Sequence, residues 1–323
     1  MGRLVTIALA MLAAGIANVR SETYPSRPIT MVVPFAAGGP VDTLTRFLAE
    51  RMRPLLGQPI IIENVTGAAG SIGVGRVARA APDGYTLVNG IWSTHVVNGV
   101  IYNLSYDVFG DFEPVALLTN GSQLIVVKKA NPASDLKGFI AWLKANPDKA
   151  SAGTAGVGSP QHIFGIQLQN ATGTRFQFIH YRGGAPATQD LVAGNIDLVI
   201  ADQVTALPQI RGGTIKAFAY TGRSRLAAAP DIPTAEEAGL PGYVTSVWNA
   251  IWAPKGTPKN VVARLNAAVV EALADDATRA RLAGLGQLVV PRDQHGSEVL
   301  RALHKAEIEK WYPIIKAAGV KAE

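Results

Sequence analysis

Short strand-like and helix-like segments alternate along this chain, and the alternation restricts the possible folds more than any other feature. Nine segments are short, rich in β-branched or aromatic residues, and bounded by Gly, Pro, Asn or Asp. They are 29–35, 59–65, 85–89, 115–118, 124–127, 176–181, 196–201, 215–221 and 248–252. Between them, the apolar residues of 41–55, 136–143 and 261–273 each fall on one face of a helix. This order predicts an α/β fold with mainly parallel sheets and helices on both sheet faces.

The first residues have the pattern of an export signal. An apolar run extends from Leu4 to Ala17, with small residues at Gly15 and Ala17, where a signal peptidase would cleave. The run is shorter than the ~20 residues that span a bilayer, so a retained membrane anchor is the less favoured alternative. We therefore expect a signal peptide within residues 1–21 and a mature protein in the periplasm.

Length, cysteine content and charge restrict the number of domains and the classes of function. The chain has 323 residues, and without the signal it still exceeds the ~250–300 residues of a single core, so two domains are expected. There is no cysteine, which excludes disulfides, thiolate metal sites and cysteine nucleophiles. The formal net charge is +6, but the basic residues are scattered and their largest clump is Lys128-Lys129. A nucleic-acid partner is therefore not expected.

The C-terminal part is expected to be mostly helical. Helical patterns cover 258–284 and 297–318. A terminal pair of helices has no core of its own, so we expect it to pack across the surface of another domain. The search for a site then turns to the strand-to-helix turns, because open sheets of this type bind ligands outside the carboxyl ends of their strands.

Three glycine-rich turns are candidates for ligand binding. They read PFAAGGPVD (34–42), ENVTGAAGSIG (63–73) and SAGTAGVGSPQH (151–162). Each places small residues at the start of a helix, where unpaired backbone N–H groups carry the positive end of the helix dipole. Glycine lets a ligand approach this backbone closely, and an anion is the natural ligand. Such a turn needs no Arg or Lys.

Each turn also has a simpler structural interpretation. The glycines can serve only as turn residues, and Asp42 can be a first-turn acid that complements the helix dipole. Ser159 can be only an N-cap, and His162 only a residue of the following first turn.

Enzyme motifs are poorly matched. Residues 73–78, GVGRVA, fit a G-x-G-x-x-A dinucleotide pattern, but His95 stands where an acid is needed. Ser159 and His162 could indicate a hydrolase, although GSPQ lacks the second glycine of a nucleophile elbow. No GKS or GKT phosphate loop occurs, and the five histidines show no HExxH spacing, so no metal site is predicted.

Eight motifs in order make the sequence resemble one known family. They are PFAAGGPVD (34–42), IIENVTGAAGSIG (61–73), APDGYTLV (81–88), YDVFGDFEPV (106–115), ASAGTAGVGSPQH (150–162), HYRGGAPA (180–187), PDIPTAEEAGLPGY (230–243) and WNAIWAPKGTP (248–258). The chain resembles the extracytoplasmic solute receptors of the tripartite tricarboxylate transporter group, the Bug family of periplasmic binding proteins, over nearly all of its mature length. Thr66 and Ala69 depart from the residues that are usual in the second turn of the family.

The resemblance implies a type II periplasmic binding fold with ligand held in a cleft between two lobes. Lobe 1 would comprise 24–124 plus 247–323, and lobe 2 would comprise 125–246. Family members hold a carboxylate through backbone amides and bridging waters of the first turn, here Phe35 to Gly39. The turn from Gly156 to His162 would contribute from the opposite lobe.

Strand-end positions matched to the family add Ser93, Thr94 and Asp202 to the candidates. A carboxylate at Asp202 would repel an anion, so it is expected to accept from a hydroxyl or amine of the ligand, or only to cap a helix. Trp92, Tyr181 and Trp248 either form walls of the pocket or belong to the core. The residues expected to contact ligand are Phe35, Ala36, Ala37, Gly38, Gly39, Gly70, Ser93, Thr94, Thr154, Ala155, Gly156, Gly158, Ser159, His162, Tyr181 and Asp202, with Asp42 serving the helix.

The expected function is a non-enzymatic receptor that captures an organic carboxylate by hinge closure. It would deliver the ligand to the membrane permease subunits of a tripartite transporter, as a monomer and without a cofactor. A periplasmic sensor that presents its ligand to a signalling receptor is an alternative. An exported hydrolase using Ser159 and His162 is the third possibility.

Overall fold

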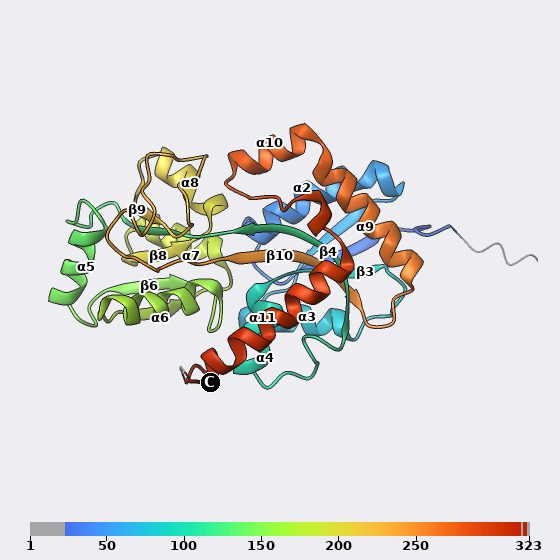
Figure 1. Ribbon diagram of the computed structural model, residues 1–323, viewed down its shortest axis with the longest axis horizontal. Coiled ribbons are helices and arrows are strands. Elements are labelled where there is room, and N and C mark those ends of the chain that lie inside the picture. The colour runs from blue at the N-terminus through green and yellow to red at the C-terminus, as the bar shows by residue number, and fades with distance from the viewer. Residues whose placement is uncertain (1–22, 318, 322–323) are drawn as a thin grey trace, which may run out of the picture.

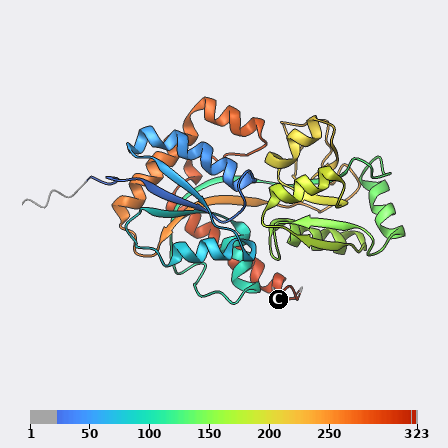
Figure 2. The ribbon, with the colours of Figure 1, turned by 180° about the vertical axis from the view of Figure 1, so that it is seen from behind.

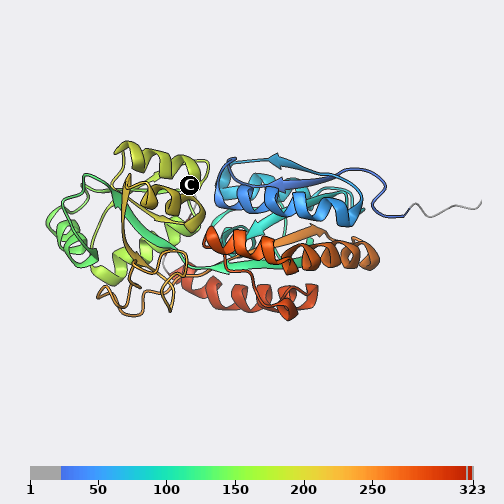
Figure 3. The same cartoon turned by 90° about the horizontal axis from the view of Figure 1, so that it is seen from above.

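A computed structural model describes residues 23–317 and 319–321, which form two α/β lobes lying side by side (Figure 1). The expected signal peptide lies outside the described residues. Within the described ranges, no helix is long and apolar enough to cross a membrane. Figure 3 shows the two lobes joined by strands that pass from one to the other.

The sheet of lobe 1 has five strands in the order β2-β1-β3-β10-β4. These strands are β1 (Ile29–Val33), β2 (Ile60–Asn64), β3 (Thr86–Ile91), β4 (Phe112–Gly121) and β10 (Val247–Pro254). Strands β1, β2 and β3 are parallel, whereas β10 runs antiparallel to both β3 and β4.

The sheet of lobe 2 repeats this plan in the order β7-β6-β8-β5-β9. Its strands are β5 (Leu124–Lys128), β6 (Ser151–Thr154), β7 (Gln177–His180), β8 (Leu198–Ala201) and β9 (Ile215–Tyr220). Here β5 runs antiparallel to β8 and β9, while β6 is parallel to β7 and β8. In each sheet, four of the five strands therefore point the same way. The reversed strand is the one that has just crossed from the other lobe, because it enters at the carboxyl edge of the sheet.

Helices cover both faces of the lobe 1 sheet, because its central strands are apolar on both sides. In Figures 1 and 2, α2 (Pro40–Leu56), α9 (Lys259–Ala274) and α10 (Asp276–Gly284) lie on one side. On the other side lie α3 (Ser71–Ala78), the short α4 (Asn98–Ile101) and α11 (Ser297–Ala317). Ile29 and Met31 of β1 pack in the core under α2 and α9, and Val32 packs in the core that includes α3 and α11. The terminal helices thus complete lobe 1, as expected from the sequence.

Lobe 2 is covered in the same way. Helices α5 (Leu136–Ala145) and α6 (Pro160–Thr172) contribute to one core, and α7 (Gly184–Ala193) and α8 (Gln203–Arg211) to the other. Strand β6 was missed by the sequence analysis, because its sequence SAGT lacks large β-branched residues. Its small residues have a packing reason: a Cβ on Gly153 would lie 2.5 Å from Cδ1 of Ile196.

Three segments meet where the lobes join. Ser122 and Gln123 link β4 to β5, and Thr245 and Ser246 lead back into β10. The third segment follows α10: the Asn120 amide donates to the Leu288 carbonyl over 2.9 Å. This segment also reaches lobe 2, where Gln287 Nε2 donates to Asp202 Oδ1 over 3.2 Å, next to the bond from Arg211 Nη2 to the carbonyl of Gly284 at the end of α10. The connection between the lobes therefore consists of three chain segments: the two that cross between the lobes and the one that follows α10. We refer to these three segments together as the hinge.

Candidate ligand-binding site

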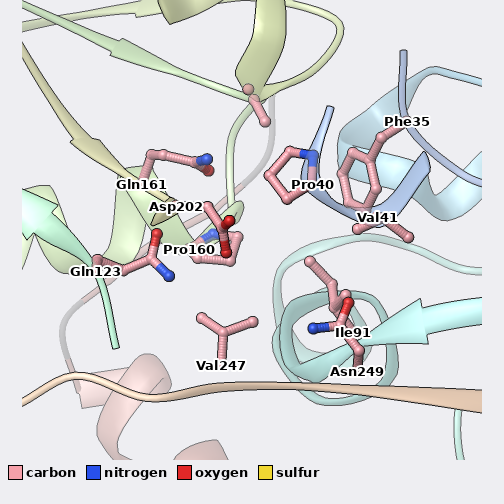
Figure 4. Close-up of a pocket in the computed structure, with 12 residues that line it drawn as sticks. Phe35, Pro40, Val41, Ile91, Gln123, Pro160, Gln161, Asp202, Val247 and Asn249 are labelled. Atoms are coloured by element: carbon pink, nitrogen blue, oxygen red, sulfur yellow. The ribbon is translucent and has the colours of Figure 1, made fainter. Parts of the chain in front are cut away.

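A small cavity, with a volume of about 40 Å³, lies between the two lobes (Figure 4). Residues from both lobes and from the hinge line it, and most of them are buried. They are Phe35, Pro40, Val41 and Ile91 from lobe 1, Gln123, Val247 and Asn249 from the hinge strands and their connection, and Ala155, Pro160, Gln161, Gly184 and Asp202 from lobe 2. Figure 4 shows the polar ends of Gln123, Gln161 and Asp202 on one side, facing Phe35, Pro40 and Val41.

The lobe 1 side of the cavity is formed by the turn between β1 and α2. Its N-cap, Gly39, has no side chain to cap the helix. Asp42, in the first turn, reaches back instead and accepts from the Gly38 amide over 2.8 Å. It also accepts from Arg46 Nε at 2.9 Å and Asn64 Nδ2 at 2.9 Å. Burial alone raises the pKa of Asp42, but the hydrogen bonds from Arg46, Gly38 and Asn64 outweigh it and lower the pKa below its usual value.

The lobe 2 side is formed by the turn between β6 and α6, which is built in the same way. Ser159 is the N-cap, and its Oγ accepts from the His162 amide over 3.4 Å. His162 Nδ1 accepts from the Gly158 amide over 3.1 Å, as Asp42 does from Gly38. Burial, with a smaller contribution from His180, lowers the pKa of His162 to about 4, so its ring is neutral at pH 7.

The two lobes also touch through residues outside the cavity lining. The Ala36 amide donates to the Arg182 carbonyl over 3.3 Å, and Tyr102 Oη donates to the Val157 carbonyl over 2.7 Å. Trp92 stacks on Phe164 of lobe 2 with ring centroids 5.5 Å apart. The lobes are thus in direct contact with each other.

Three of the sequence-predicted site residues line the cavity: Phe35, Ala155 and Asp202. Several other predicted groups already have partners inside the protein. The amides of Ala36, Gly38 and Gly39 donate to protein oxygens, and Ala37 is exposed. Of the backbone surface predicted from Phe35 to Gly39, only Phe35 lines the cavity, together with the adjoining Pro40.

Other predicted residues support the turns that form the cavity. A Cβ on Gly70 would lie 3.3 Å from Cζ of Phe35, so Gly70 makes room for that ring. Thr94 Oγ1 bonds both the amide and the carbonyl of Ile91, at 2.9 Å each. Thr154 Oγ1 lies 2.6 Å from His180 Nδ1 and accepts from the Gly156 amide. Ser93, next to Thr94, is fully buried in a π-helix (Ser93–Val97).

The aromatic candidates do not line the cavity. Trp92 and Trp248 are buried core residues, and Trp248 packs against Trp252. The Tyr181 hydroxyl donates to Asp190 Oδ2 over 2.6 Å.

The second glycine-rich turn, residues 63–73, reaches the opposite lobe despite its departures from the family pattern. Ala69 has a left-handed φ of 47°, and a Cβ on Gly156 would lie 3.4 Å from it.

Sequence reasoning missed most of the lining. The missed residues are Pro40, Val41, Ile91, Gln123, Pro160, Gln161, Gly184, Val247 and Asn249. Pro160 and Gln161 stand inside the quoted third turn, and Gly184 inside HYRGGAPA, so a signal existed for these. Val247 and Asn249 belong to a buried strand, and nothing in an apolar strand sequence marks which residue faces a ligand.

Asp202 connects the cavity to the hinge. As N-cap of α8, its Oδ1 accepts from the Val204 amide at 2.8 Å and from Gln287 Nε2 at 3.2 Å. Gln287 Oε1 accepts from Thr119 Oγ1 at 3.2 Å, and Thr119 accepts from Asn249 Nδ2 at 3.1 Å. A chain of hydrogen bonds thus runs from one lining residue to another through the hinge. Burial raises the pKa of Asp202 to about 6 against the lowering effect of its hydrogen bonds.

Apolar and amide side chains make up most of the cavity lining, with Asp202 as its one carboxylate. No Lys, Arg or His lines the cavity, and the described residues contain no group of three or more acids, histidines or cysteines that could hold a metal ion. Ser159 is fully buried, and its Oγ faces the His162 backbone amide rather than a ring nitrogen that could act as a base. The possible dinucleotide pattern at 73–78 lies inside α3 rather than in a turn.

Comparison with known proteins agrees with this geometry. A family model, the tripartite tricarboxylate transporter family receptor, matches residues 44–320. BugT of Bordetella pertussis is 33% identical, with 98% of each chain covered. The solved structure of the periplasmic binding protein BugD is 38% identical with a TM-score of 0.89, covering 93% of this chain and all of BugD. The malate-bound MatC of Rhodopseudomonas palustris is 40% identical with a TM-score of 0.87, covering 90% of this chain and all of MatC. BugD is described as a periplasmic binding protein, and MatC was solved with bound malate. The chain belongs to the receptor family of tripartite tricarboxylate transporters, the Bug family of periplasmic binding proteins.

Proposed function

We propose that this protein captures an organic carboxylate in the periplasm and delivers it to the membrane permease of a tripartite tricarboxylate-type transporter. The observation that carries the proposal is the cavity between the lobes, flanked by the N-termini of α2 and α6, whose first residues Pro40 and Pro160 line it. Helix N-termini favour anions without requiring a basic side chain. The malate bound to MatC supports a carboxylate as the class of ligand.

Binding proceeds by hinge closure in this proposal. A ligand held by one lobe gains contacts with the other only in the closed state, so binding shifts the population toward that state. The hydrogen bond from Ala36 to Arg182 and the Trp92–Phe164 stack would form at closure. The sequence-predicted contacts outside the lining, from Ala36 to Gly39 and at Gly156, Gly158, Ser159 and His162, remain part of the proposal, because opening of the lobes frees these turns.

The organisation of the chain is proposed on the same basis. Lobe 1 comprises 24–124 plus 247–323 and lobe 2 comprises 125–246, in a protein that is exported through a cleaved signal peptide and works as a monomer without a cofactor. The crossing strands β5 and β10 begin at Leu124 and Val247, which supports these boundaries.

A calorimetric and thermal-shift screen of the mature protein tests the function. The panel contains mono-, di- and tricarboxylates, aromatic acids, and neutral sugars as controls. We expect at least one acid to raise the melting temperature and no sugar to do so, since a ligand that binds only the folded state stabilises it. Stabilisation by a sugar but by no acid would contradict the proposal.

A variant pair locates the binding in the cavity. Ala155 lines the cavity, and Ala155→Phe is expected to fill it and to abolish acid binding. The matched control is Ala141→Phe on the exposed face of α5, which should bind acids like the unmodified protein. If Ala155→Phe folded normally and bound the acid unchanged, the site would lie elsewhere.

A further inference from the structure

One wall of the cavity presents two oxygen acceptors that the protein's own donors satisfy poorly or not at all. Among the lining residues, Asp202 alone carries an ionisable side chain. Its Oδ1 is well occupied by the Val204 amide and Gln287, whereas Oδ2 has only the long 3.5 Å contact with Gln287 Nε2. Asp202 is also the one acidic residue that lines a cavity proposed to bind a carboxylate, so its weakly bonded Oδ2 requires a specific partner.

Gln161 adds a second, independent acceptor on the same wall. Its side chain is 8% exposed and lines the cavity, and its Oε1 has no hydrogen-bond partner in the described protein. In Figure 4, Gln161 and Asp202 extend toward the same space from lobe 2. A buried polar oxygen without a donor destabilises the protein, so Gln161 Oε1 favours a ligand that brings a donor. Asp202 Oδ2, with only its long contact to Gln287, can accept from the same kind of group.

We propose that the ligand carries a hydrogen-bond donor, a hydroxyl or ammonium group beside its carboxylate, and that Asp202 with Gln161 selects ligands by this group. The inference rests on the proposed function and names its substrate class: 2-hydroxy or 2-amino carboxylic acids in preference to the unsubstituted acids. The carboxylate of the ligand then lies away from Asp202, toward the helix N-termini at Pro40 and Pro160. An unsubstituted acid would leave the acceptors of Asp202 and Gln161 unpaired.

The hydrogen bonds around Asp202 make this selection geometrically strict. The Val204 amide and Gln287 fix the carboxylate from two sides, and Gln287 is itself fixed through Thr119. The rotamer of Asp202 is therefore set before a ligand arrives. A preorganised acceptor discriminates between ligands with and without a donor more strongly than a mobile one does.

The ionisation of Asp202 supports the same selection. Burial places the pKa of this carboxyl at about 6, so at pH 8 it is a carboxylate that can only accept. The other titratable group that interacts with it is the hydroxyl of Tyr220, and no Lys, Arg or His lines the cavity. At pH 8 the carboxylate of Asp202 therefore has no cationic side chain of the cavity lining beside it. This favours a ligand that places an ammonium or a hydroxyl group there.

Calorimetric titration at pH 8 with matched pairs of acids tests the proposal. The pairs are succinate and malate, glutarate and 2-hydroxyglutarate, adipate and 2-aminoadipate, and phenylacetate and mandelate. We expect the substituted member of the best-binding pair to bind at least tenfold more tightly. In Asp202→Asn, whose amide can donate toward the cavity, this preference should fall to within about twofold or reverse.

Two controls separate the possible outcomes. Asparagine is itself a good N-cap, so α8 should stay folded. Asp135→Asn makes the same change at the N-cap of α5, which does not line the cavity, and should leave the preference intact. If acids bind but show no preference, or if Asp202→Asn keeps the preference of the unmodified protein, the selection by Asp202 is wrong and the receptor function stands. If no acid in the panel binds while neutral solutes do, the proposed function fails and this inference fails with it.

Discussion

The two turns that face each other across the cavity are built to one plan and held by different chemistry. Gly38-Gly39-Pro40-Val41-Asp42 in lobe 1 corresponds to Gly158-Ser159-Pro160-Gln161-His162 in lobe 2. In both, the second residue is the N-cap, the proline opens the helix, and the fifth residue accepts from the amide of the first. The residue five positions before the proline, Phe35 or Ala155, lines the cavity in both lobes.

The acceptors at the fifth position differ in charge and surroundings. Asp42 is ionised and receives donors from three residues, two of them from outside its own turn. His162 is neutral, receives one donor through its ring, and lies against the rings of Phe178 and His180. The lobe 1 turn is thus held by a charged network and the lobe 2 turn by packing and a neutral hydrogen bond. The two turns therefore share a hydrogen-bond acceptor at the fifth position, although a different residue supplies it in each lobe.

The largest expected effect comes from removing the lobe 1 acceptor. Asp42→Ala leaves the Gly38 amide without its partner and removes one acceptor from each of Asn64 and Arg46, so it should lower the free energy of unfolding by about 3 kcal/mol. Ser159→Ala removes only the side-chain cap of the lobe 2 helix and should cost about 1 kcal/mol. Urea unfolding followed by circular dichroism measures both. Equal costs would contradict the contrast drawn between the turns.

A second pair of variants separates the two turns by their contact with the opposite lobe. Gly38 and Gly158 have φ of 76° and 85°, so alanine strains both by about 1–2 kcal/mol. A Cβ on Gly38 meets nothing within 4 Å, whereas on Gly158 it would lie 2.1 Å from Ile101 Cδ1 and 3.3 Å from Asn98 Oδ1, both of lobe 1. Gly158→Ala should therefore weaken acid binding about tenfold by opposing closure, equivalent to about 1.4 kcal/mol. Gly38→Ala should change the affinity for the acid less than twofold. If calorimetry shows the same loss of affinity in both variants, closure does not depend on the contact of residue 158 with lobe 1.

The smallest expected effect is a difference in pH dependence. The folded-state pKa of His162, about 4, lies below the ordinary value of 6.5, so the stability contributed by its neutral ring is complete above pH 6.5 and is lost as the pH falls toward 4. The pKa of Asp42 is lowered, so its contribution is present above pH 3.8 and is lost only at lower pH.

Melting temperatures at pH 7 and pH 5 measure this difference. His162→Gln should lose less stability than the unmodified protein over this interval, by about 1 kcal/mol. His180, in ring contact with His162, also has a lowered pKa. Because His180 is present in both proteins, a difference between them is assigned to His162. Asp42→Asn is the matched variant in lobe 1 and should follow the pH dependence of the unmodified protein. If His162→Gln follows it too, another group governs stability in this range.

Local sequence was enough for the features that depend on a few neighbouring residues. The alternation of segments predicted the α/β class and nine of the ten strands found in the described residues, and the three glycine turns fall at the carboxyl ends of strands as expected. The role of Asp42 in the first turn of α2 was open to prediction, because it depends on a residue four positions away. Strand β6 escaped because SAGT carries no strand propensity, and its strand form is imposed by neighbours on both sides.

The tertiary structure decided which side chains meet at the site. Asp202, Gln287, Thr119 and Asn249 are far apart in sequence and form one hydrogen-bonded chain only because three hinge segments lie together. Val247 and Asn249 face the cavity because β10 crosses from lobe 2 into lobe 1 beside it. The sequence alone thus determined the turns and the helix starts, whose hydrogen bonds close within a few residues. Which groups line the cavity depended on the packing of two lobes, because that arrangement is set by contacts between distant segments.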